Sequence, residues 1–274
     1  MLQREITENY TLDIVSRLID FYNDSGFMQS GIIKWAPPIV AFGKVQTSEI
    51  ATVGLNPSNL EFMTQNKYEI TGAVRRFHTL KSLNLNDWGE VQEKHLYQIL
   101  EFCECYFDNN PYDAWFKRLD YVISGEKISY YFPCYNACHL DLVPFATETK
   151  WNDLRPEQKK SLIGLSKNSL GAIIKNSTIK VLVLNGQSVV DNFLKITDLE
   201  LIKKLQTTWE LKRANGKNVS GFSYEGHVMK IGEISLRRSV CVLGFNHNLQ
   251  SSYGITKKVM SEIKNWITYQ LNNH

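Results

Sequence analysis

The stretch Ile50-Ala51-Thr52-Val53-Gly54-Leu55-Asn56-Pro57-Ser58 joins a short apolar run to a polar turn. A run rich in β-branched residues is typical of a buried strand in a parallel sheet, and Gly, Asn and Pro are typical of the tight loop that follows it. In open α/β sheets, ligands bind outside the carboxyl ends of the strands. Asn56 is therefore predicted to face a substrate.

Composition is that of an ordinary globular protein. The chain has 274 residues, of which 43% are apolar and 22% charged, so it can bury a sizeable core and resembles neither a disordered nor a membrane-spanning chain. The N-terminus lacks the basic-then-apolar pattern of a signal peptide, and a cytoplasmic protein is expected. A formal net charge of +3, from 31 basic and 28 acidic residues, neither supports nor excludes a nucleic-acid partner.

The five cysteines favour free thiols over disulfides in a reducing compartment. Cys103, Cys105, Cys134 and Cys138 could in principle hold a metal or an iron–sulfur cluster. Their Cys-x-Cys and Cys-x3-Cys spacings do not match the usual zinc pattern, and small buried thiols are the simpler interpretation. No metal and no cofactor is therefore expected.

Hydrophobic periodicity predicts alternating helices and strands, as in the βα units of a parallel sheet. Helices are expected over residues 10–24, with Thr11 as a cap, and over residues 75–83, 91–107, 112–123, 157–175 and a final stretch through 266. Strands are expected over residues 50–53, 137–145, 179–184 and 239–245, and around a turn at Asn215-Gly216.

Several strand-to-loop junctions resemble, in order, those of the uracil-DNA glycosylase superfamily. Gly54 to Ser58 is similar to the Gly-x-Asn-Pro-Gly of its mismatch-specific uracil/thymine branch, and Arg75-Arg76-Phe77-His78 to the Asn-Arg-Phe-Trp that follows it. Residues 142–147 resemble that branch's Leu-Val-Asp-Arg-Pro-Thr, residues 181–188 its third strand, and residues 242–250 stand in the place of the second catalytic motif. The resemblance spans about residues 48–265.

This resemblance implies a three-layer α/β/α fold around a short, mainly parallel four-stranded sheet. A single domain over residues 1–274 is expected, with an N-terminal helical extension over about 1–45 and a helical insertion over about 85–135. Together with Trp115-Phe116 and His139-Leu140-Asp141, the long insertion resembles a less-studied branch of the superfamily.

The activity that the resemblance implies is that of a monofunctional DNA glycosylase, which flips a nucleotide out of duplex or single-stranded DNA and hydrolyses its N-glycosidic bond. Asn56 matches the family residue that holds the attacking water, which suits an amide oxygen; a purely structural role before Pro57 is the alternative. His247 is the candidate for the second catalytic group, although Asn246 or Asn248 could take that place. The expected partner is DNA, and no membrane is expected.

Further residues have expected roles at the base or at the DNA backbone. Asp141 is expected to meet a ligand or to pair with His139, and Leu249 to be a wedge in the base stack or else a core leucine. The candidates for the base pocket are Gly54, Leu55, Phe62, Tyr68, His139, Asp141, Phe145 and Asn246. The candidates for DNA contacts are Ser58, Arg75, Arg76, Gln187, Ser188, Asn248, Leu249, Gln250 and Ser251.

Three functions are open from the sequence, and the long insertion and the altered final motif favour the first, with greater activity expected on a bulky modified cytosine than on uracil. The first is removal of a bulky modified pyrimidine, such as the glucosylated hydroxymethylcytosine of phage DNA in antiviral defence, with His139, Asp141 and Tyr130-Tyr131 binding the sugar hydroxyls. The second is base-excision repair of uracil or thymine mismatches. The third, of another class, is a non-catalytic nucleic-acid-binding sensor with the same fold; a metal-bound regulatory module that uses the four cysteines is a further rival.

Overall fold

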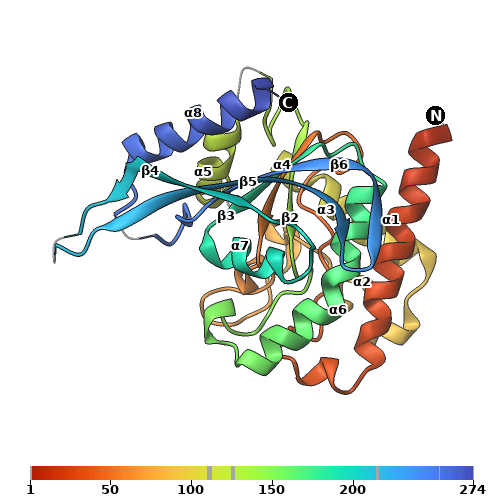
Figure 1. Cartoon of the computed structure of the whole chain (residues 1–274). Coiled ribbons are helices and arrows are strands. Elements are labelled where there is room, and N and C mark those ends of the chain that lie inside the picture. Colours follow the sequence, from red (N-terminus) through yellow and green to blue (C-terminus); the bar gives the residue numbers. More distant parts are fainter. Residues whose placement is uncertain (1, 110–112, 125–126, 214–215, 253, 274) are drawn as a thin grey trace.

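A six-stranded mixed sheet forms the centre of the computed structural model, which describes residues 2–109, 113–124, 127–213, 216–252 and 254–273 (Figure 1). The strand order is β2-β1-β3-β6-β5-β4. The strands are β1 (Ile50–Gly54), β2 (Ala137–Asp141), β3 (Val181–Asn185), β4 (Ile202–Leu211), β5 (Val219–Ile231) and β6 (Ile234–Phe245). This confirms the α/β class and the predicted strands; of the predicted turn at Asn215-Gly216, Asn215 lies outside the described residues.

The expected four-stranded sheet is too small. Strands β2, β1, β3 and β6 do pair in parallel, but β5 and β4 extend the sheet with two antiparallel strands. The chain reverses between β5 and β6 at Gly232, whose φ of 57° suits a two-residue hairpin turn. Pairing between strands so far apart in the sequence depends on tertiary contacts, which a short-range pattern does not reveal.

Helices lie on both faces of the sheet (Figure 1). On one side α6 packs on β5 and β6, and α7 packs on β3 and β6; on the other side α5 and α8 pack together, with α8 against β4. The helices are α1 (Leu2–Asp20), α2 (Leu80–Leu83), α3 (Glu93–Glu104), α4 (Tyr106–Asn109), α5 (Asp113–Ile123), α6 (Pro156–Lys175), α7 (Gln187–Leu194) and α8 (Lys257–Asn273).

Two helix predictions need correction. The helix expected over residues 75–83 begins only at Leu80, because Thr79 caps it by accepting a hydrogen bond from Ser82 N, while Arg75 has an extended backbone. The first helix begins well before Thr11, which is therefore not its cap. The helix predicted over residues 112–123 is α5, and residue 112 lies outside the described residues.

The N-terminal segment is built into the domain and does not stand apart from it. Ile32 and Phe42 form antiparallel bridges with Thr147 and His139, and Phe42 exchanges backbone hydrogen bonds of 2.8 and 2.9 Å with His139. Residues 32–42 thus run along the outer edge of β2, and they bring Phe42 next to the carboxyl end of that strand. Within the described ranges, no helix has an apolar stretch long enough to cross a membrane.

Candidate active site

A small pocket lies at the carboxyl ends of β1 and β2, where the sequence predicts a ligand. Gly54 and Asp141 are register partners at these two ends, and the loop after β1 carries Asn56. The pocket has a volume of about 120 Å³. Its lining residues are Phe42, Asn56, Pro57, Ser58, Glu61, Trp115, Phe116, His139 and Asp141.

Asn56 is held so that its amide oxygen is the available atom. The amide nitrogen donates to Thr147 Oγ1 at 3.0 Å and, more weakly, to the carbonyl oxygens of Pro57 at 3.1 Å and Phe145 at 3.4 Å. All three partners are acceptors here, since Thr147 Oγ1 uses its own proton to donate to the Thr149 carbonyl at 2.7 Å. Among the described residues Oδ1 has no hydrogen-bond partner, so it can accept a hydrogen bond from a water or a ligand in the pocket.

His139 and Asp141 sit side by side against Gly54. His139 Nε2 is 3.4 Å from Asp141 Oδ1, and His139 Nδ1 is 2.7 Å from the hydroxyl of Thr52. A Cβ on residue 54 would collide with Asp141 Oδ1 and would lie only 2.9 Å from His139 Nε2. Glycine is therefore required at position 54 for this pair to lie over the end of β1, and the predicted pairing of Asp141 with His139 is confirmed.

Aromatic side chains surround His139. The ring centroids of Trp115, Phe116 and Phe42 lie 5.2, 5.4 and 5.5 Å from that of the imidazole, each in an edge-on arrangement. The backbone of Trp115 is fixed from the final loop, because Gln250 Nε2 donates to the Trp115 carbonyl at 3.1 Å. The pocket wall is thus aromatic on this side.

Glu61 is a polar group of the pocket that the sequence did not reveal. The residue is only 3% exposed, and its carboxylate accepts hydrogen bonds from the Tyr106 hydroxyl, 3.1 Å from each oxygen, and from Arg76 at 3.5 Å. Burial raises the pKa of Glu61 to about 7, and the nearby Asp141 adds to this, although Arg76 and Tyr106 oppose it. A buried carboxyl group with a pKa near neutrality in a pocket is typical of an acid–base catalyst.

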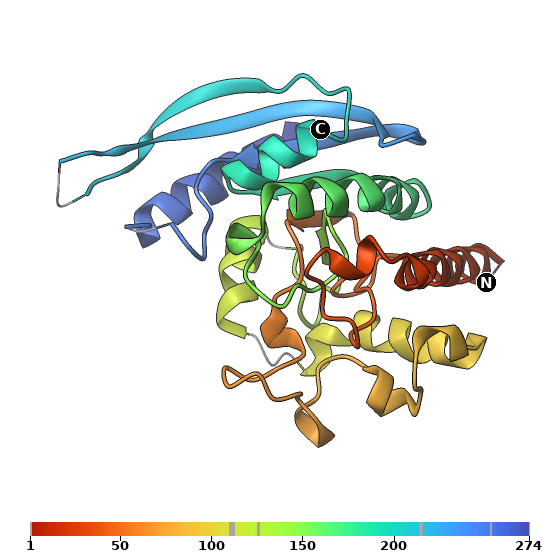
Figure 2. The same cartoon turned by 90° about the horizontal axis from the view of Figure 1, so that it is seen from below.

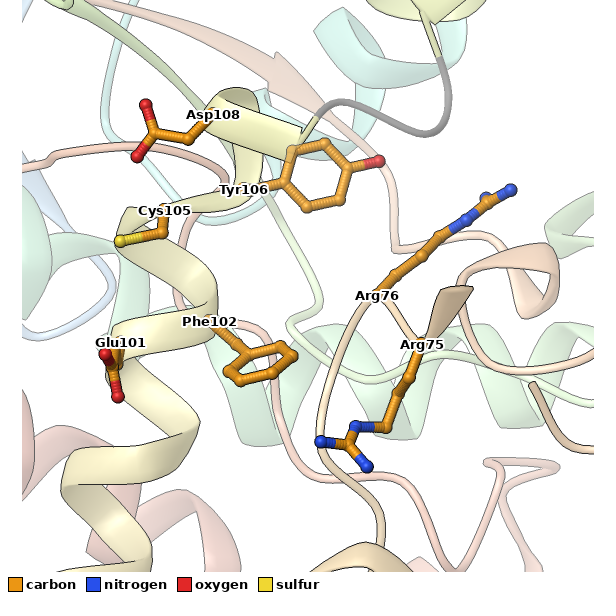
Figure 3. A pocket seen from close by; sticks show the side chains of 7 residues that line it. All are labelled: Arg75, Arg76, Glu101, Phe102, Cys105, Tyr106 and Asp108. Atoms are coloured by element: carbon orange, nitrogen blue, oxygen red, sulfur yellow. The ribbon is translucent and has the colours of Figure 1, made fainter. Parts of the chain in front are cut away.

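A second cavity, of about 350 Å³, is lined in part by Arg76 and Tyr106, the two hydrogen-bond partners of Glu61. Figure 3 shows Arg75 and Arg76 facing Phe102 and Tyr106 across it; Glu101, Cys105 and Asp108 complete its lining. Arg76 is not directed outward, since it donates to the Leu60 carbonyl at 3.1 Å as well as to Glu61. Arg75 lies over the Phe102 ring at 5.4 Å, and its Nε is buried without a hydrogen-bond partner in the described part of the chain.

The aromatic residues expected in the base pocket lie elsewhere. Phe62 and Phe145 are each 1% exposed and pack in aromatic clusters of the core, Phe62 against Phe77 and Phe145 against Phe27. Tyr68 is 73% exposed, and it does not line the pocket. The aromatic residues that line the pocket are instead Trp115, Phe116 and Phe42.

The polar residues of the final motif do not face the pocket. His247 is 2% exposed, and because its Nε2 contacts the Trp209 carbonyl at 2.8 Å, that nitrogen must carry the proton and donate. Burial lowers the pKa of His247. The side chain of Asn246 is likewise engaged within the protein. It donates a hydrogen bond to the Ser220 carbonyl and accepts one from Phe222 N, both at 2.8 Å. The polar side chains that line the pocket beside Asn56 are therefore Glu61 and Asp141, and not the predicted residues of this loop.

The rest of the final loop is also engaged in internal contacts. Leu249 is fully buried, its N donates to Asn185 Oδ1 at 3.1 Å, and its carbonyl accepts from Arg118 at 2.8 Å. Asn248 Oδ1 accepts from the backbone N of Gln250 and Ser251, which fixes the turn. Leu249 is thus a core residue and not a wedge exposed to a base stack.

Replacing Leu249 by alanine is expected to lower the free energy of unfolding by roughly 2–5 kcal/mol, because the change leaves a cavity in a closed core. Denaturant titration measures this loss, and Leu205→Ala, at a leucine that is 59% exposed, is the matched control with little effect. Unchanged stability of Leu249→Ala, together with a loss of excision confined to duplex DNA, would instead support the predicted role of Leu249 as a wedge in the base stack.

The other predicted residues are placed as follows. Ser58 lines the pocket, and its Oγ accepts from Leu60 N at 3.2 Å. Leu55 is half-buried, and its carbonyl accepts from Val143 N at 2.9 Å. Gln187 bonds Asp191 and Tyr224, whereas Ser188 is exposed in the first turn of α7. Only Ser58 of this group belongs to the pocket.

The cysteines form no metal centre in the part of the chain that the structure describes. No group of three or more His, Cys, Asp or Glu side chains there could hold a metal ion. Cys103 and Cys138 are buried, and burial raises the pKa of each thiol to about 12, as for inert core thiols. The regulatory module built on these cysteines therefore has no geometric support.

Comparison with known proteins adds no family. No protein-family model matches the chain, and no curated protein matches it. A function is therefore inferred from the pocket itself.

Proposed function

We propose that the chain is a monofunctional DNA glycosylase that hydrolyses the N-glycosidic bond of a flipped pyrimidine nucleotide. The observation that carries the proposal is the fixed amide of Asn56, whose oxygen is left available in a pocket with two carboxyl groups and an aromatic wall. Such a pocket can take a planar ring only after the base has left the stack, as base-flipping enzymes require.

In the proposed reaction, Asn56 Oδ1 holds the water that attacks C1′ of the sugar. The water oxygen forms a bond to C1′ while the bond from C1′ to the base nitrogen breaks and its electron pair leaves with the base. Glu61 accepts the proton of the water, a role for which a pKa of about 7 is well matched. Asp141, held by His139, accepts a hydrogen bond from an N–H group on the edge of the base.

The pocket volume favours a base without a bulky substituent. At about 120 Å³ the pocket is smaller than the roughly 300–1,000 Å³ typical of sites for drug-sized ligands, so it suits a single ring. The Tyr130 hydroxyl, expected at the sugar of a glucosylated base, instead contacts Thr52 at 2.5 Å in the core. We therefore place excision of uracil or mismatched thymine first.

Excision of a bulky modified cytosine is the second candidate, and it is favoured by the 350 Å³ cavity that Arg76 and Tyr106 help to line. A sugar substituent that passed from the pocket between Glu61 and Tyr106 into this cavity would have to break the hydrogen bonds from Tyr106 to Glu61. That rearrangement would have to be offset by contacts of the substituent with the cavity wall.

A single-turnover assay on duplexes that carry uracil, mismatched thymine or glucosylated hydroxymethylcytosine tests the proposal. We expect uracil or thymine to be removed at least about tenfold faster than the glucosylated base, since a buried pocket excludes what it cannot fit. The reverse preference would assign the protein to the bulky base. Tight DNA binding with no abasic sites on any substrate would instead indicate a non-catalytic sensor.

A further inference from the structure

Strands β4 and β5 extend past the carboxyl ends of the parallel strands, the side of the sheet at which the pocket lies. Ser223 and Phe245 are the last register partners of β5 and β6 on this side, and Phe245 is level with Asn185 at the carboxyl end of β3. Past this point, within the described part of the chain, the register partners of β5 lie in β4, as in the pairs Gln206 with Gly221 and Leu211 with Val219. Residues 206–213 and 216–222, here called the arm, project from the body of the molecule (Figures 1 and 2).

The arm has the dimensions of a two-stranded ribbon that fits B-DNA. The four residues from Ser223 to Val219 alone reach about 13 Å past the sheet edge at about 3.3 Å per residue. The major groove is about 12 Å wide and about 8.5 Å deep, and it admits a two-stranded β-ribbon. The arm is therefore long enough to contact a duplex that is bound at the pocket edge.

Positive charge is concentrated at the end of the arm. Lys212, Arg213 and Lys217 are exposed there, and Glu210 is the one acidic residue in the sequence of the arm. The Glu210 carboxylate already accepts a hydrogen bond from Asn218 Nδ2 at 2.9 Å. An excess of two positive charges in these 15 residues is large beside the net +3 of the whole chain, and Lys and Arg side chains are the usual partners of DNA phosphates.

The base of the arm is fixed to the body. Trp209 is 1% exposed and packs edge-on against Trp266 of α8 with ring centroids 5.5 Å apart, and its carbonyl accepts the hydrogen bond from His247. Gly221 allows the two strands to approach here, since a Cβ at that position would collide with Trp209 Cβ. The residues of the final motif thus hold the arm in place instead of facing the base.

We propose that the arm contacts the phosphate backbone of duplex DNA beside the flipped nucleotide through Lys212, Arg213 and Lys217. The proposal rests on the proposed function, in that it takes DNA as the substrate. It assigns the sequence-independent part of the affinity to an element outside the pocket lining, while the pocket selects the base.

The test is a salt titration of the binding of unmodified duplex DNA by the full chain. The variant Lys212→Glu/Arg213→Glu/Lys217→Glu is expected to bind at least about tenfold more weakly at low salt. The slope of log affinity against log salt is expected to fall by about 0.9 for each phosphate that the variant no longer neutralises. The control variant Lys175→Glu/Lys180→Glu/Lys195→Glu makes the same change of charge near the amino ends of the parallel strands, away from the pocket. It is expected to change the DNA affinity and the salt slope much less.

Each outcome separates the two proposals. A drop in affinity and slope in the arm variant supports the arm, even if the wild-type chain forms no abasic sites and the proposed reaction is wrong. Equal affinity and slope in the wild type and the arm variant would overturn the proposal that the arm contacts DNA phosphates. This result would not bear on the proposed excision reaction. A wild-type chain that binds no duplex at all would overturn both.

Discussion

Alanine at position 56 is expected to lower base excision by about 10²-fold or more while the protein remains folded. The amide oxygen of Asn56 acts mainly on the attacking water, so its removal lowers the rate of the chemical step more than the affinity for DNA. Because the side chain lies in a loop and is only half-buried, its removal opens no cavity in the core. Single-turnover excision and DNA affinity, measured on the same preparation, separate the two effects.

Asn59 offers a matched control for this change. It lies three residues further along the same loop, its side chain donates to the Glu148 carbonyl at 3.3 Å, and it is not part of the pocket lining. Asn59→Ala is expected to retain excision close to that of the wild type. Near-normal excision by a folded Asn56→Ala protein would remove Asn56 from the mechanism.

Glu61→Gln is expected to reduce excision by about 10²-fold or more and to abolish its rise with pH around neutrality. A general base must be ionised to accept a proton, so the wild-type rate should increase as pH passes through about 7, the pKa of Glu61. Glutamine has a similar shape but cannot accept the proton. A pH–rate profile of both proteins between pH 5 and 9 measures the effect.

Tyr106→Phe gives the profile a second, independent readout. The Tyr106 hydroxyl stabilises the ionised carboxylate of Glu61, so its removal should raise the pKa of Glu61 and move the rise in rate to higher pH. An unchanged midpoint in Tyr106→Phe, or a rise with pH that persists in Glu61→Gln, would show that another group acts as the base.

The same group makes stability depend on pH in a defined direction. The pKa of Glu61 is about 7 in the folded chain and 4.5 for an ordinary glutamate, so the native state binds the proton more tightly than the unfolded chain. Its contribution is therefore fully present below about pH 4.5 and is lost as pH rises through about 7. Glu61→Gln should show a weaker decline in unfolding free energy over this window.

The sequence was sufficient to place Asn56, His139 and Asp141, and the reason is local. Each lies at or just after an apolar run that forms a buried parallel strand, and parallel strands bring their carboxyl ends to one edge. Trp115 and Phe116 were singled out together with His139 and Asp141 only through the family resemblance, and their rings do lie around the imidazole.

The final motif could not be predicted, because its partners come from distant strands. A loop with two asparagines and a histidine indicates a site only if its polar groups are left without protein partners. Here Asn246 and His247 bond β5 and β4, whose pairing with β6 enlarges the sheet. Glu61 was missed for a similar reason: nothing near it in the sequence shows that Tyr106 and Arg76 stabilise a buried carboxylate there.

The measurement that tests the central claim most directly is quantification of both products from a uracil-containing duplex incubated with wild-type or Asn56→Ala protein. Mass spectrometry counts the free base, and alkaline cleavage counts the abasic sites. The proposed hydrolysis predicts equal amounts of the two products, strand breaks only after alkali, and about a hundredfold less of both with Asn56→Ala. Release of neither product from uracil-, mismatched thymine- or glucosylated hydroxymethylcytosine-containing DNA, or equal release by both proteins, would contradict the assignment of this pocket to base excision.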